Sequence, residues 1–133
     1  MSRNPRTAIQ TPHAPAAIGP YAQGRTGSLS GRWIVSSGQV GLDPATGALV
    51  PGGVQPETEQ AMRNLEAVLK AADAGLGDVV KTTVFLADMA EFGAMNEIYG
   101  RFFPDSKPAR STVAVRSLPK DARVEIEVWA FLT

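Results

Sequence analysis

The clearest pattern in the chain is the alternation of side-chain types over residues 123–132, near the C-terminus. A two-residue period is typical of a β-strand whose two faces meet different surroundings. One face of this strand would present Val124, Ile126, Val128 and Ala130. The opposite face would present Arg123, Glu125, Glu127, Trp129 and Phe131. We therefore expect the first face to lie in the core beneath helices, and the second to lie outside it.

Three further segments, residues 33–35, 79–86 and 109–115, are rich in β-prone residues and are separated by turn signals or helical patterns. In the middle segment, the alternation predicts one face made of Val80, Thr82, Val84 and Leu86. Residues 118–121, which include Pro119, predict a loop between the last two strands.

Two segments have the period of amphipathic helices. The first covers residues 56–74, and its apolar stripe is Ala61, Leu65, Val68 and Ala72, with Met62 and Leu69 beside it. The second runs from Asp88 to Pro104, with Glu91 spaced as in a capping box, and its stripe is Phe92, Met95, Tyr99 and Phe102. The order of elements predicts an α+β fold, in which two helices cover one face of a mixed sheet.

The length of 133 residues fits one domain, which we place at residues 16–133 after a loose N-terminal arm at residues 1–15. Residues 1–42 contain arginines but no acidic residue. We interpret these arginines as belonging to a tail and exposed loops. A weak phosphate contact or an organellar targeting segment is the alternative.

Composition excludes several kinds of chemistry. The chain has no Cys, so disulfides, zinc thiolates and cysteine nucleophiles are excluded, and a reducing cytoplasm is the expected location. Lys and Arg number 13, equal to Asp and Glu, so a nucleic-acid partner is not indicated. No apolar run is long enough to predict a membrane-spanning helix or a secretory signal.

The face of the sheet that the helices leave open depends on how residues 109–115 are turned. If the small side chains of Ser111 and Val113 face the helices, Arg110 and Glu125 share the open face. Aromatic side chains beside charges on that face favour burial against other copies of the chain. A solvated face with an incidental ion pair is the alternative. The first interpretation requires that Arg110 does not point beneath the helices.

A pocket between such copies could bind a small carboxylic acid. The Arg110 guanidinium matches a carboxylate with two parallel hydrogen bonds. The Glu125 carboxylate can position and deprotonate a water molecule. Gly38, which follows Ser37, allows close approach to the backbone and offers an unshielded N–H. These residue types place water beside a bound acid, but they do not specify a reaction.

Several short motifs, spread in order over residues 14–131, resemble those of the RidA (YjgF-type) family. They are Ala16-Ala17-Ile18-Gly19-Pro20-Tyr21 with Gln23-Gly24, Ser36-Ser37-Gly38-Gln39, Gly77-Asp78-Val79-Val80-Lys81-Thr82-Thr83-Val84-Phe85, Met95-Asn96 with Tyr99 and Phe102-Phe103, Pro108-Ala109-Arg110-Ser111, and Leu118-Pro119-Lys120-Asp121 with Val124-Glu125-Ile126-Glu127. The resemblance implies a homotrimer whose sheets form a central barrel with clefts between subunits. It also implies hydrolysis of 2-aminoacrylate-type enamines and imines, released by pyridoxal-phosphate dehydratases, to 2-oxo acids and ammonia, with no cofactor and no metal.

The resemblance also implies roles for individual residues. Arg110 would bind the substrate carboxylate, and Glu125 would orient the attacking water. Glu127 lies on the same face of the strand as Glu125, so only the motif assigns this role to Glu125. An interface ion pair is the alternative role for Glu125. Ser37 and Gly38 would form a loop that contacts the substrate, or else a plain turn.

Three other residues match the cleft of the family. Tyr21 and Asn96 would line it, although packing or solvent exposure would explain them equally simply. Thr112 stands where many family members have Cys. A hydroxyl can keep a hydrogen bond there without a thiol's reactivity, so we expect activity to survive and substrate preference to be affected.

Three alternative functions stay open at this point. One is a non-catalytic regulatory trimer that binds a carboxylate metabolite in the same cleft. A second is a deaminase specialised for one catabolic pathway. RNA binding or cleavage is the least favoured, because the charge is balanced and no catalytic His lies near a basic patch.

Overall fold

The computed structural model describes residues 7–28 and 30–133. Its main sheet has five strands, in the order β3-β7-β5-β6, with β4 also pairing with β7. Strand β5 pairs in parallel with β6, and the pairings of β7 are antiparallel, so the sheet is mixed. The strands are β3 (Arg32–Val35), β4 (Gln39–Val40), β5 (Val79–Leu86), β6 (Ala109–Ala114) and β7 (Val124–Leu132).

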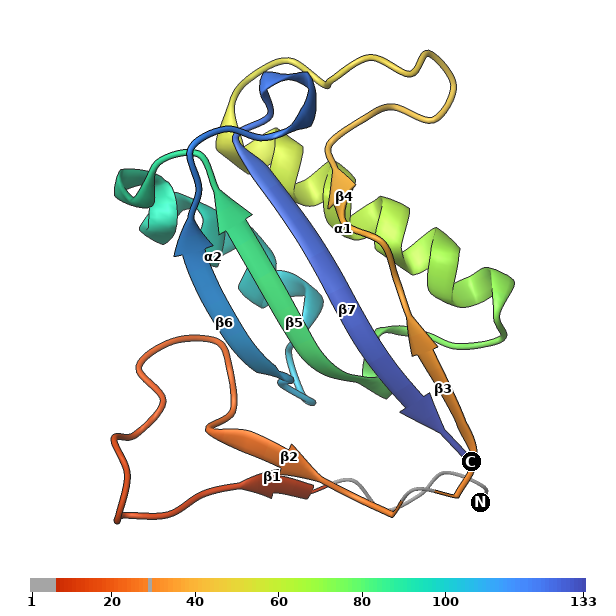
Figure 1. Cartoon of the computed structure of the whole chain (residues 1–133), viewed down its shortest axis with the longest axis vertical. Coiled ribbons are helices and arrows are strands. Elements are labelled where there is room, and N and C mark those ends of the chain that lie inside the picture. The colour runs from red at the N-terminus through yellow and green to blue at the C-terminus, as the bar shows by residue number, and fades with distance from the viewer. Residues whose placement is uncertain (1–6, 29) are drawn as a thin grey trace.

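Two helices, α1 (Val54–Ala71) and α2 (Phe92–Phe102), lie together behind the sheet in Figure 1, so the other sheet face is open. The predicted α+β arrangement is confirmed. Between these layers is a core built from α1, α2, β5 and β7, in which Leu65, Met95 and Ile126 are fully buried. No helix among the described residues combines the length and apolarity needed to cross a membrane.

The predicted facing of β7 is confirmed. Its four apolar residues from Val124 to Ala130 are at most 1% exposed and pack under the helices. On the open face, the side chain of Trp129 is 47% exposed, and that of Trp33 on β3 is 66% exposed. The two indole rings lie 6.4 Å apart, so the open face presents an aromatic patch.

The predicted facing of β6 is wrong. Arg110 pairs with Thr82, and Thr112 pairs with Val84, which places both β6 residues on the side of the buried residues of β5. Val113 is 42% exposed on the open face instead. The physical reason is that β6 is an edge strand, and α2 beside it supplies polar and aromatic partners for a long side chain. Small side chains were therefore not needed on the helix side.

Two smaller predictions of facing are also wrong. On α1, Val68 is 38% exposed, whereas Met62 and Leu69 are fully buried, so the apolar stripe is rotated from the predicted centre. On β5, Val79 is buried and Val80 is only partly so, because the register with β7 shifts between Val79 and Lys81.

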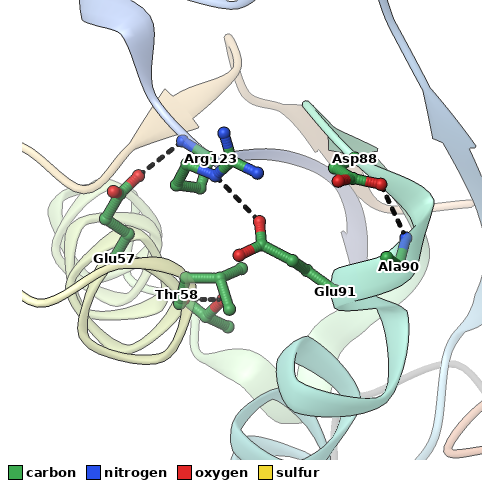
Figure 2. A network of polar contacts seen from close by, with 7 residues as sticks. Glu57, Thr58, Asp88, Ala90, Glu91 and Arg123 are labelled. Atoms are coloured by element: carbon green, nitrogen blue, oxygen red, sulfur yellow. Dashed lines mark hydrogen bonds and ion pairs between the residues drawn. The ribbon is translucent and has the colours of Figure 1, made fainter.

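A polar network joins both helical segments to the start of β7 (Figure 2). The Arg123 backbone N–H donates to the Glu57 carboxylate at 2.7 Å. The Nε of the Arg123 side chain donates to the Glu91 carboxylate at 2.8 Å. Asp88 caps the short turn η2 (Met89–Glu91) by accepting from the Ala90 N–H. The predicted capping box is thus only half formed, since the Glu91 side chain binds Arg123 instead. The network fixes the chain two residues before Glu125.

The segment before the sheet forms a hairpin of β1 (Thr7–Ile9) and β2 (Gly24–Thr26). The Gln23 side chain closes the intervening loop, because its amide donates to the Pro15 carbonyl at 2.7 Å and accepts from the Thr11 N–H. Residues 1–6 of the predicted arm lie outside the described residues, and the domain boundary stays a prediction. A bridge between Ala22 and Ala109 ties this loop to β6.

Candidate functional site

Arg110 occupies a half-buried site between β6, α2 and the loop at Tyr21. Its Nη1 donates to Asn96 Oδ1 at 2.7 Å. The guanidinium carbon lies 4.8 Å from the ring centroid of Tyr99, 5.3 Å from that of Tyr21 and 5.4 Å from that of Phe92. These distances are within the range of cation–π contacts, so three rings and one amide hold the cation in place.

In the part of the chain that the structure describes, the charge of Arg110 is not balanced by a nearby acid. No ion pair joins it to an acidic side chain among residues 7–28 and 30–133. Burial lowers the pKa of Arg110, and the Tyr99 and Tyr21 side chains partly oppose this shift. An arginine nevertheless stays protonated in proteins. A partly desolvated cation whose protein partners are all neutral is a good receptor for an anion.

The loop before β2 brings Tyr21 to this cation. The Tyr21 N–H donates to the Gly19 carbonyl at 2.7 Å, and the Ile18 N–H donates to the Tyr21 hydroxyl at 3.2 Å. A Cβ at Gly19 would stand 3.3 Å from the Tyr21 ring and 3.7 Å from Arg110 Nη2. The glycine therefore lets this loop close tightly over the cation.

Thr112 lies on the same face of β6 as Arg110, two residues along the strand. Its hydroxyl oxygen is buried and has no hydrogen-bond partner in the described part of the chain. Buried hydroxyl groups usually have a partner, so this oxygen is a candidate contact for a ligand.

A second cluster, formed by Glu125, Gly38 and Ser37, lies on the open face. Glu125 pairs with Phe85 of β5 and with Val40 of β4. A Cβ at Gly38 would stand 2.7 Å from the Glu125 carboxyl carbon, so only a glycine leaves room for this side chain in its position. Ser37, the residue before Gly38, is exposed.

The two clusters do not meet within one chain. Arg110, Asn96, Tyr21 and Thr112 gather at the helix side of the β6 edge, whereas Glu125 and Gly38 lie on the opposite face of the sheet. The structure therefore places the predicted carboxylate-binding arginine and the predicted base in two separate clusters. They can act on one ligand only if two copies of the chain contribute.

Sequence reasoning missed the roles of Phe92 and Tyr99 at the cation. Both were assigned to the apolar stripe of α2, with Asn96 treated separately. Their spacing contains the missing signal, because residues 92, 96 and 99 fall on one face of a helix. An amide between two aromatic residues on that face indicates a polar partner buried among them.

Fold and site together define a class of protein, a small α+β domain in which aromatic rings surround an arginine at the edge of the sheet. The chain matches the family model described as endoribonuclease L-PSP over residues 11–132. It belongs to that family, the RidA (YjgF) family, as the motifs indicated.

Similar proteins include enzymes and solved structures. The mouse protein named 2-iminobutanoate/2-iminopropanoate deaminase is 54% identical over 130 residues, covering 98% of this chain and 94% of the mouse protein. A putative endoribonuclease from Thermotoga maritima is 45% identical, with a TM-score of 0.74, covering 94% of this chain and 96% of that one. Escherichia coli TdcF, solved with bound serine, is 39% identical, with a TM-score of 0.73, covering 96% of this chain and 99% of that one.

Proposed function

We propose that this protein hydrolyses 2-imino acids, and the enamines that tautomerise to them, to 2-oxo acids and ammonia. The observation that carries the proposal is the half-buried Arg110 cation, which lacks an acidic partner among the described residues. The names of the mammalian relatives, at about half identity over nearly the whole chain, point to the same reaction.

We further propose that the site is completed by a neighbouring copy in a homotrimer with a central barrel. Because Arg110 and Glu125 lie on opposite faces of one sheet, a cleft between subunits can bring them together. The edge strand β6 of one copy would pack near the open face of the next. Burial of the exposed Trp33 and Trp129 would favour this association. The cleft thus differs from the sequence-based picture, in which one face held both residues.

In this cleft, the Arg110 guanidinium binds the carboxylate of the imino acid, while Asn96 and the Tyr21 ring hold the guanidinium in place. Thr112 offers the substrate its hydroxyl, which has no hydrogen-bond partner among the described residues. From the neighbouring copy, the loop at Ser37 and Gly38 contacts the bound acid, and Glu125 positions a water molecule. Glu127 shares the facing of Glu125 and is the alternative base.

The reaction then needs only positioned water. The water oxygen bonds to the imine carbon, the C=N pair of electrons moves to nitrogen, and Glu125 takes the proton that water loses. The resulting carbinolamine receives that proton on nitrogen. The carbinolamine hydroxyl then passes its own proton, through Glu125, to the nitrogen, and the C–N bond breaks as the C=O bond forms, which releases ammonia and a 2-oxo acid. An enamine must first take a proton at carbon to become the imine.

The test is the rate of 2-oxo acid release from freshly generated 2-aminoacrylate and its 2-iminobutanoate homologue. The wild-type protein should accelerate it, and Arg110→Ala should lose at least about tenfold in kcat/KM, since a charged hydrogen bond contributes roughly 1.5–3 kcal/mol. Equal rates for the two proteins would remove Arg110 from the mechanism. A panel of imino acids separates a general role from a pathway-specific one.

The same preparation tests the alternative functions. Tight binding of 2-oxobutanoate without any rate increase would favour a non-catalytic regulatory trimer. RNA cleavage is not favoured, because the chain has one His and no net charge. Salt-sensitive binding of RNA by the purified protein would instead favour a function on RNA.

A further inference from the structure

Tyr99 lies where the buried core meets the Arg110 cation. It is fully buried in α2, and its ring centroid is 4.8 Å from the Arg110 guanidinium carbon. Its hydroxyl lies 2.7 Å from the hydroxyl of Thr82, which is also fully buried. Two polar groups that would otherwise be unsatisfied in the core therefore pair with each other.

The partner of Tyr99 is set by strand register. Thr82 is the residue of β5 that pairs directly with Arg110 of β6, so the two side chains leave the sheet side by side on the same face. The hydroxyl contact therefore anchors the Tyr99 ring at the same register position from which Arg110 emerges. A ring held in this way has little freedom to rotate away from the guanidinium.

We propose that Tyr99, anchored by Thr82, is a positioning residue that fixes the plane of the Arg110 guanidinium for bidentate binding of a carboxylate. This inference rests on the proposed function, because it assigns Tyr99 a part in binding the same acid. Asn96 occupies Nη1, and the ring restricts the guanidinium from a second direction. A fixed fork loses less entropy when it binds a carboxylate than a mobile one does.

The ionisation state of Tyr99 supports this role. Burial raises the pKa of Tyr99 to about 12, although the Thr82 hydroxyl and the Arg110 charge oppose the shift. The phenol therefore stays neutral at physiological pH. It contacts the cation without neutralising it, which leaves the positive charge for the ligand.

Three variants separate positioning from packing. Tyr99→Leu removes the ring, Tyr99→Phe removes only the anchor, and the Tyr99→Phe/Thr82→Val pair removes both hydroxyls without leaving one unpaired. Phe103→Leu is the matched packing control, because Phe103 is 2% exposed and its ring lies 5.0 Å from the Tyr99 ring. Urea midpoints show whether each variant is folded and how stable it is.

We expect Tyr99→Leu to raise KM for the imino acid and Kd for 2-oxobutanoate by about fivefold to tenfold, the size of one partly desolvated cation–π contact. The kcat should change less than about threefold, because the base and water are untouched. Tyr99→Phe and the double variant should lie between wild type and Tyr99→Leu. Phe103→Leu should leave KM and Kd near the wild-type values.

The proposal is overturned if Tyr99→Leu raises KM no more than Phe103→Leu does, or if kcat falls while KM is unchanged. Failure of the proposed function looks different, because wild-type protein would then not accelerate imine hydrolysis at all. The Kd for 2-oxobutanoate still tests Tyr99 in that case, since it requires only the carboxylate site.

Discussion

Gly38 stands so close to the Glu125 carboxylate that a Cβ at position 38 would lie 2.7 Å from the carboxyl carbon of Glu125. The glycine immediately before β4 and the acid on β7 are thus fitted to each other across the antiparallel pairing of the two strands. This relationship links a turn in the sequence to the placement of the proposed base.

The first prediction is that Gly38→Ala displaces the Glu125 side chain and lowers kcat for imine hydrolysis by at least about tenfold. The Kd for 2-oxobutanoate should change less than kcat does, because Arg110, the proposed partner of the carboxylate, belongs to the other cluster. Gly75→Ala is the control, since a Cβ at Gly75 meets nothing within 4 Å. An active Gly38→Ala enzyme would show that Glu125 does not need its present position.

Asn96→Asp should convert the neutral partner of Arg110 into an acidic one. The new carboxylate would form an ion pair with Nη1 and compete with the substrate, so KM should rise by at least about tenfold above the Asp pKa of about 4. Asn96→Ala, which removes one neutral hydrogen bond, should have a smaller effect. KM measured against pH checks this, and a pH-independent KM equal to that of Asn96→Ala would contradict it.

Thr112→Val tests the buried hydroxyl that lacks a partner among the described residues. Removing an unsatisfied buried hydroxyl should stabilise the free protein by about 1 kcal/mol or more, measured from urea unfolding. If the hydroxyl binds substrate, KM should also rise several-fold. Unchanged kinetics in a stabilised variant would leave Thr112 with no part in binding.

Complementation tests the proposed two-copy site. Arg110→Ala and Glu125→Ala should each be nearly inactive alone. Co-expression of the two variants gives trimers that contain both. A cleft is complete when it receives the wild-type arginine from one copy and the wild-type glutamate from the next. Random assembly of equal amounts completes about one cleft in four. The unfractionated co-expressed population should therefore regain about a quarter of wild-type activity, and purified trimers that contain both variants, each with one complete cleft of three, should regain about a third. No recovery, with mixing verified by mass, would mean that each site belongs to one chain.

Glu57 should contribute a pH dependence to stability. Burial raises the pKa of Glu57, with the Arg123 N–H and charge opposing the shift. A raised folded-state pKa contributes stability below the unfolded value, about 4.3, and loses it as pH rises through the folded value. The wild-type protein should therefore lose stability relative to Glu57→Gln as pH rises from about 4. Urea midpoints at several pH values check the sign, and the opposite trend would contradict it.

Some of the site could be predicted from the sequence because its signals are local. The facing of β7 was confirmed because its two residue sets differ so strongly that only one can enter the core. The same alternation put Glu125 on the open face. The motifs around Tyr21, Gly38, Asn96 and Arg110 singled out residues that the fold gathers. They did not predict that these residues form two separate clusters.

What only the tertiary structure decided is the side on which Arg110 leaves the sheet. A two-residue period divides β6 into two sets of residues, but it does not say which set faces the helices when both sets contain polar side chains. The choice was made by α2, where Asn96, Phe92 and Tyr99 provide a hydrogen bond and ring faces for a guanidinium. Those partners are 11 to 18 residues away in sequence, and only packing brings them to the edge strand.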